Sequence, residues 1–107
     1  MNVPAQISVE QFKAMMDQGR DFVLLDVREA HELDICRFDA FVHIPLGEID
    51  TRAAELPADR HIVVTCHHGG RSGKACQILG KKGYAVTNLA GGIHEWAIKI
   101  DPSMETY

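Results

Sequence analysis

The chain has 107 residues and a formal net charge of −4, from 15 acidic and 11 basic side chains. This length suits one domain with its own core, so we take residues 1–107 as a single domain with a core over about residues 6–101. The acidic balance argues against a nucleic-acid surface, and no apolar run approaches the ~20 residues that cross a bilayer, so neither nucleic acid nor membrane is predicted as a partner.

The cysteine pattern indicates the compartment. Three cysteines, Cys36, Cys66 and Cys76, form an odd and sparse set. The first six residues contain neither a basic segment nor an apolar one of the kind that directs secretion. We therefore expect free thiols and a cytoplasmic location.

A first helix is predicted to begin at the capping box Ser8-Val9-Glu10-Gln11 and to stop at Gly19. Its apolar face would carry Val9, Phe12 and Met16. The residues that follow read as a regular succession of strands and helices. Strands are expected at 21–27, 42–44, 61–65 and 84–89, and helices over about 46–56, about 72–82 and about 92–101.

The apolar runs at 21–27 and 61–65 are continuous rather than alternating, which is typical of parallel strands covered on both faces. Strands that alternate with helices predict an α/β domain with a parallel sheet, right-handed crossovers and helices on both faces.

The segment Cys66-His67-His68-Gly69-Gly70-Arg71-Ser72 is the strongest functional signal. It joins a predicted buried strand to a helix that begins near Arg71 or Ser72, so Cys66 lies at the carboxyl end of a strand, where α/β sheets form ligand crevices. Gly69 and Gly70 allow backbone amides to turn inward as an anion-binding nest, and the helix N-terminus adds positive potential. These features favour the thiolate, so Cys66 is predicted to be a nucleophile. Cys36 and Cys76 lack this setting and are predicted to be non-catalytic.

Three segments together resemble the rhodanese-like domain family. Leu24-Leu25-Asp26-Val27-Arg28-Glu29 is similar to its amino-terminal signature, residues 66–72 to its active-site loop, and Asn88-Leu89-Ala90-Gly91-Gly92-Ile93-His94-Glu95-Trp96 to its carboxyl-terminal signature. The chain departs from the family at Cys36-Arg37 and Ala40-Phe41, where Gly-His and Gly-Ala pairs are usual. These departures put the local backbone and any partner surface there in question.

The resemblance implies a single rhodanese-like domain with a five-stranded parallel sheet. It also implies a sulfurtransferase in which Cys66 carries sulfane sulfur as a persulfide, from a donor such as thiosulfate to cyanide or a thiol. The substrate-binding residues would be those of the loop, with backbone amides around the sulfur and Arg71 on the anion: His67, His68, Gly69, Gly70, Arg71 and Ser72. Asp26 and Arg28 are interpreted as a salt-bridged scaffold beneath the loop.

The expected partners are a small-molecule or protein persulfide donor and a thiol acceptor, and no oligomeric state is predicted. The expected reaction needs no organic cofactor. No metal is expected either, because Cys66, His67 and His68 are adjacent and match no familiar zinc spacing. The two histidines would instead line the mouth of the pocket and attract anionic donors when protonated, below about pH 6.5.

Two other functions remain open. A cysteine phosphatase or arsenate reductase uses a similar thiolate cradle, but such enzymes need five residues between cysteine and arginine. Here four residues separate Cys66 from Arg71, and no assured aspartate general acid is found. A non-enzymatic rhodanese-like docking module is the second alternative, although such copies typically lose the cysteine that this chain keeps.

Overall fold

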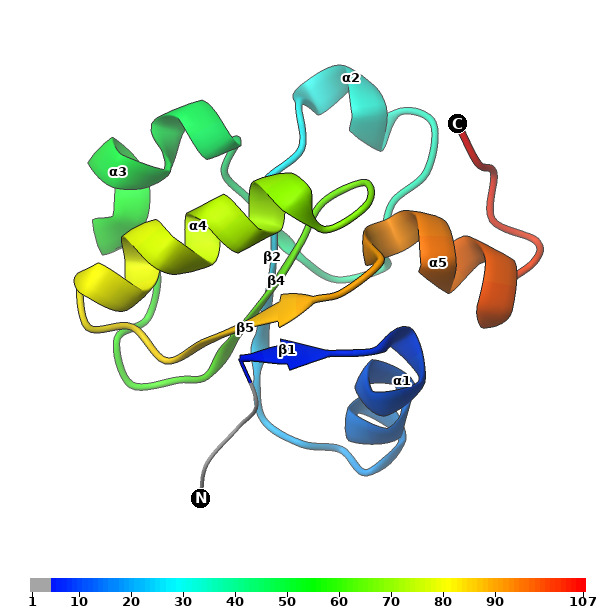
Figure 1. Ribbon diagram of the computed structural model, residues 1–107, viewed down its shortest axis with the longest axis horizontal. Helices are drawn as coiled ribbons and strands as arrows, with labels where there is room; N and C mark the ends of the chain where they lie inside the picture. The colour runs from blue at the N-terminus through cyan, green and yellow to red at the C-terminus, as the bar shows by residue number, and fades with distance from the viewer. Residues whose placement is uncertain (1–4) are drawn as a thin grey trace.

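A five-stranded, wholly parallel sheet forms the centre of the computed structural model, which describes residues 5–107. The strand order is β1-β5-β4-β2-β3, so β4 lies in the middle, between β5 and β2 (Figure 1). The strands are β1 (Gln6–Ile7), β2 (Val23–Asp26), β3 (Val42–His43), β4 (Ile62–Thr65) and β5 (Val86–Leu89). This arrangement confirms the predicted fold class.

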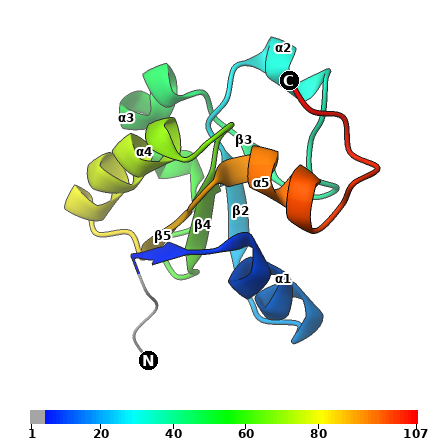
Figure 2. The ribbon, with the colours of Figure 1, turned by 45° about the vertical axis from the view of Figure 1, so that its right-hand side comes forward.

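Helices cover both faces of the sheet (Figures 1 and 2). The helices are α1 (Val9–Asp17), α2 (Ala30–Leu33), α3 (Ile49–Arg52), α4 (Gly70–Lys81) and α5 (Gly92–Lys99), and short 3₁₀ turns flank α3. One core cluster joins α3 and α4 to Leu25 and Val64, while the other joins α1 and α5 to Leu24 and Val63. Adjacent residues on one strand thus belong to opposite clusters, which explains the continuous apolar runs in the sequence.

The predicted elements agree with the structure in type and order, with three differences. The Ser8 capping box is present, but the buried methionine of α1 is Met15, whereas Met16 is 45% exposed because it borders the cavity described below. The two-residue strand β1 and the one-turn helix α2 were not predicted from periodicity. Both are too short to show a repeat in apolar residues.

The sheet places Cys66 directly after β4, and backbone contacts from α5 hold it there. The amides of Ile93 and His94, in the first turn of α5, donate to the carbonyls of Cys66 and His67, both at 3.0 Å. Gly92 precedes them with φ +59°, and a Cβ atom on it would lie 2.5 Å from the Cys66 carbonyl oxygen and 2.6 Å from that of His67. This close approach requires glycine.

None of the helices within residues 5–107 is both long enough and apolar enough to span a bilayer.

We predict that Gly92→Ala lowers the free energy of unfolding by roughly 2–4 kcal/mol, because the new methyl group clashes with backbone and the residue is held at positive φ. Gly80→Ala is the matched control. Gly80 lies in α4 with no atom near its Cβ position, so alanine should stabilise the protein by about 0.5–1 kcal/mol. Urea unfolding followed by circular dichroism measures both. Equal stability of Gly92→Ala and wild type would contradict the close packing of α5 on the Cys66 loop.

Candidate active site

Cys66 is 1% exposed and is the first residue of the loop formed by residues 66–72, hereafter the Cys66 loop. The backbone amide of Gly69 donates a hydrogen bond to Sγ at 3.0 Å. The hydroxyl of Ser72 lies 3.3 Å from the same sulfur. Both groups can donate a hydrogen bond to an anionic atom at this position.

The backbone conformation of Gly69 aims its amide at the sulfur. Gly69 has φ +117° and is the N-cap of α4, which begins at Gly70, slightly earlier than expected. The positive end of the α4 dipole therefore points toward the sulfur. Within residues 5–107, the loop amide that donates to Sγ is that of Gly69, and a wider cradle over His67 to Ser72 stays a prediction.

Asn88 fixes the Cys66 loop from the end of β5. Its amide nitrogen donates to the carbonyl of Gly69 at 3.1 Å, and its Oδ1 accepts from the buried hydroxyl of Ser72. The same hydroxyl is 3.2 Å from the Gly69 carbonyl. Because a hydroxyl has one proton, Ser72 serves one acceptor at a time and can turn from Asn88 to the sulfur as negative charge develops there.

Arg71, the residue expected to bind anions, is held by Glu32 in a two-pronged ion pair. Its terminal nitrogens donate to the two carboxylate oxygens at 2.7 and 2.8 Å. These hydrogen bonds are the main reason that the pKa of Glu32 lies far below its usual range, against the opposing effect of burial. They also raise the pKa of Arg71, as does the charge of Cys66. Glu32 lies on α2, 39 residues before Arg71, and no local motif pointed to it.

Tyr107 contacts the Cys66 loop through His67, because the segment after α5 returns toward α2 (Figure 2). Its ring stacks on that of His67, with centroids 3.7 Å apart and planes 4° from parallel. Its hydroxyl donates to Glu32 at 2.8 Å and accepts from Arg28 at 3.1 Å. Burial is the main cause that raises the pKa of Tyr107 to about 12, so the hydroxyl stays protonated at neutral pH.

Three imidazoles gather at the Cys66 loop. The ring of His67 is 3.9 Å from that of His68 and 5.7 Å from that of His94, between centroids. Burial, followed by the charge of His68, lowers the pKa of His67, so this ring becomes cationic only at a lower pH than an ordinary histidine. Nε2 of His67 and Nδ1 of His94 are buried without a hydrogen-bond partner in the part of the chain that the structure describes.

The other two cysteines lie outside the loop. Cys36 is buried beside Arg28, whose guanidinium donates to its carbonyl oxygen at 2.9 Å. Burial raises the pKa of Cys76 to about 11, so its thiol is protonated at neutral pH. Across residues 5–107, no group of three or more His, Cys, Asp or Glu side chains is arranged to hold a metal ion.

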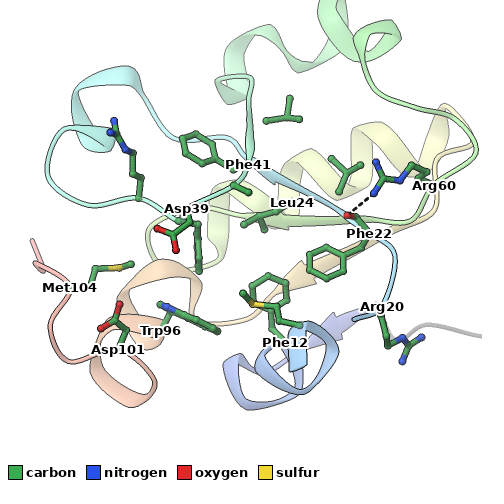
Figure 3. A pocket seen from close by; sticks show the side chains of 16 residues that line it. Phe12, Arg20, Phe22, Leu24, Asp39, Phe41, Arg60, Trp96, Asp101 and Met104 are labelled. Carbon is green, nitrogen blue, oxygen red and sulfur yellow. Dashed lines mark hydrogen bonds between the residues drawn. The ribbon is translucent and has the colours of Figure 1, made fainter. Parts of the chain in front are cut away.

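A separate cavity of about 600 Å³ opens between α1, α5 and the segment that precedes β3 (Figure 3). Phe12, Phe22 and Trp96 form much of its wall, and Phe41, one of the departures from the family pattern, also lines it. None of the residues 66–72 lines this cavity. We therefore assign no step at Cys66 to it.

Comparison with known proteins assigns the chain to a family. The family model described as "Rhodanese-like domain" matches residues 8–99. The chain therefore belongs to the rhodanese-like domain family, as its three sequence signatures predicted.

Relatives extend the comparison. "Putative sulfur carrier protein YrkF" of Bacillus subtilis is 38% identical over 97 residues, which are 90% of this chain and 52% of that protein. The "Adenylyltransferase and sulfurtransferase MOCS3-2" of Zea mays is 32% identical over 111 residues, with 96% of this chain and 23% of that protein covered. This chain thus spans about half or less of these two curated relatives. The solved structure of the human single-domain sulfurtransferase TSTD1 matches with a TM-score of 0.79 at 25% identity, over 91% of this chain and 98% of that one.

If Tyr107 shields Cys66, Tyr107→Ala should raise the rate at which the neutral reagent iodoacetamide alkylates Cys66, by several-fold. Tyr107→Phe keeps the ring that stacks on His67 and should react more nearly at the wild-type rate. Peptide mass spectrometry over a time course measures the modification of each cysteine, with Cys36 and Cys76 as internal controls. A single rate of Cys66 alkylation in all three proteins would show that Tyr107 does not limit access.

Proposed function

We propose that this protein is a sulfurtransferase that carries sulfane sulfur as a persulfide on Cys66. The observation that carries this proposal is the placement of one buried thiol at the carboxyl end of β4, with the Gly69 amide and the N-terminus of α4 directed at its sulfur. Membership of the rhodanese-like family and the names of the sulfurtransferase relatives support it. The three cysteines are free, which fits action in a reducing compartment, the cytoplasm.

The reaction has two displacements. The thiolate of Cys66 attacks the outer sulfur of thiosulfate, so that a new S–S bond forms while the old bond breaks and sulfite leaves with its electron pair. An acceptor, cyanide or a thiolate, then attacks the outer sulfur of the persulfide and Cys66 leaves as thiolate. Sulfite is thus released in the first displacement and thiocyanate or a new persulfide in the second, and no external oxidant or reductant is needed.

Groups around the sulfur stabilise each anionic state. The Gly69 amide donates to Cys66 and can follow the charge to the outer sulfur, and the Ser72 hydroxyl can turn from Asn88 toward it. Arg71 faces the leaving anion. His67 and His68 line the entrance in this scheme, and the lowered pKa of His67 favours its neutral form.

Phosphoryl transfer is less well supported. Four residues separate Cys66 from Arg71, which makes a narrower ring than the five-residue spacing that encloses a phosphoryl group. A docking role without catalysis would not require the buried thiol or its amide donor.

Cys66→Ser should abolish transfer of sulfur from thiosulfate to cyanide while leaving the fold intact, because a hydroxyl cannot form a persulfide. Cys36→Ser and Cys76→Ala should retain most of the activity. Thiocyanate formation measures turnover, and the intact mass after exposure to thiosulfate should show one added sulfur that the Cys66→Ser variant lacks. Loss of turnover in a folded Cys76→Ala variant would require a mechanism with a second, resolving cysteine.

Arg71→Ala should raise the KM for thiosulfate by about tenfold or more, with a smaller change in kcat, because the substitution removes a cation and leaves Glu32 unpaired near the incoming anion. Steady-state kinetics over a range of thiosulfate concentrations separates the two constants. A collapse of kcat at constant KM would instead place the action of Arg71 in the transition state alone.

A further inference from the structure

The Cys66 loop contains a cation whose charge is largely offset in the resting protein. Arg71 donates to both oxygens of Glu32, so the guanidinium that would receive a leaving sulfite already has an anionic partner. An exposed ion pair of this kind would exchange readily with solvent ions. This one is different, because Glu32 is 7% exposed and lies on α2, at the edge of the site.

The carboxylate of Glu32 accepts hydrogen bonds on both of its oxygens from three residues. Besides Arg71, Oε2 accepts from the backbone amide of Glu29 at 2.8 Å, and Oε1 accepts from the hydroxyl of Tyr107 at 2.8 Å. Tyr107 is in turn held by Arg28 and by the stack on His67. A buried carboxylate with four such hydrogen bonds stays ionised and stays in place.

We propose that Glu32 is a specificity-determining residue: by engaging Arg71 it disfavours dianionic sulfur donors, so that persulfides of low charge, borne by a thiol, are the preferred donors. This inference rests on the sulfur transfer proposed above. A dianion that approaches Arg71 must either displace Glu32 or accept its repulsion, and both reduce affinity. A donor R–S–SH avoids this penalty, since Cys66 attacks its outer sulfur and the thiolate R–S⁻ leaves with the electron pair of the broken S–S bond.

Tyr107 adds to this selection as a positioning residue. Its hydroxyl orients Glu32, and its ring covers the histidine next to Cys66. A donor therefore meets a neutral aromatic surface and a compensated ion pair instead of an open cationic pocket. Such a surface suits an uncharged organic group better than a small, strongly hydrated anion.

Glu32→Gln tests the proposal, with Glu55→Gln as the matched control. Glu55 also pairs with an arginine, Arg52, so its substitution changes the net charge equally but leaves Arg71 paired. We expect Glu32→Gln to lower the KM for thiosulfate about three- to tenfold while the KM for 2-mercaptoethanol persulfide changes less than about twofold. Glu55→Gln should leave both values as in wild type. An unchanged ratio of the two KM values in Glu32→Gln would overturn the proposal.

A binding measurement separates this role from turnover. With Cys66→Ser as the background, calorimetry should show that sulfite binds more tightly when Glu32→Gln is added. If neither donor transfers sulfur with wild type or any variant, the proposed function fails, whatever the sulfite affinity. If sulfur is transferred but sulfite affinity and the thiosulfate KM do not respond, the role of Glu32 alone fails.

Should Glu32→Gln melt below the assay temperature, the comparison can be made in a background that lacks Arg71. The single variant Arg71→Ala keeps Glu32, and the double variant Arg71→Ala/Glu32→Met lacks it. The second should have the lower thiosulfate KM, because it lacks the uncompensated carboxylate. Equal KM values would again overturn the proposal.

Discussion

The buried ion pair between Asp26 and Arg28 is the interaction on which the rest of the site depends. Both side chains are fully inaccessible, and the guanidinium donates to the carboxylate from Nε and Nη2 at 2.8 to 3.0 Å. Burial acts to lower the pKa of Arg28, but hydrogen bonds with Asp26 and Tyr107 outweigh it, so the pKa is raised and the charge is kept. An unpaired buried charge costs several kcal/mol, which means that neither partner can be lost alone without a large penalty. The interpretation of this pair as scaffold thus agrees with its contacts.

Arg28 also connects three segments that no regular element joins. It donates to the carbonyl of Cys36 at 2.9 Å and to the hydroxyl of Tyr107 at 3.1 Å, while its own carbonyl contacts His43 of β3 at 2.7 Å. The path continues from Tyr107 to Glu32 and from Glu32 to Arg71, each through a charge-assisted contact. The charge of Arg71, the residue proposed to bind the leaving anion, is therefore offset by a carboxylate whose contacts lead back to a buried pair, which gives the entrance a fixed geometry.

Features that depend on neighbouring residues could be predicted from the sequence, whereas contacts between residues far apart in the chain could not. Ser8 and its capping box, the continuous strands and the helix after Gly69 are visible within a few neighbouring residues, and each agrees with the structure. Cys66 was likewise identified from its immediate neighbours, although its chemistry remains a proposal. Glu32 and Tyr107 meet across 75 residues, and Arg71 meets Glu32 across 39, so nothing local could pair them. The expectation that Arg71 binds the anion likewise took no account of Glu32, because the pairing of two distant charges is a property of the assembled fold.

Holding the sulfur and selecting the donor depend on different parts of the structure, although a sequence motif shows only the loop. The sulfur is held by the backbone: the amide of Gly69, the dipole of α4, and the amides of α5 that bind the loop carbonyls. These contacts depend on glycine conformations and leave side chains at the entrance free to vary. Selection among donors depends instead on side chains outside the loop, Glu32 on α2 and Tyr107 after α5. Two proteins with an identical loop can consequently differ in the donors they accept, because residues elsewhere in the chain determine how far the positive charge of Arg71 is offset.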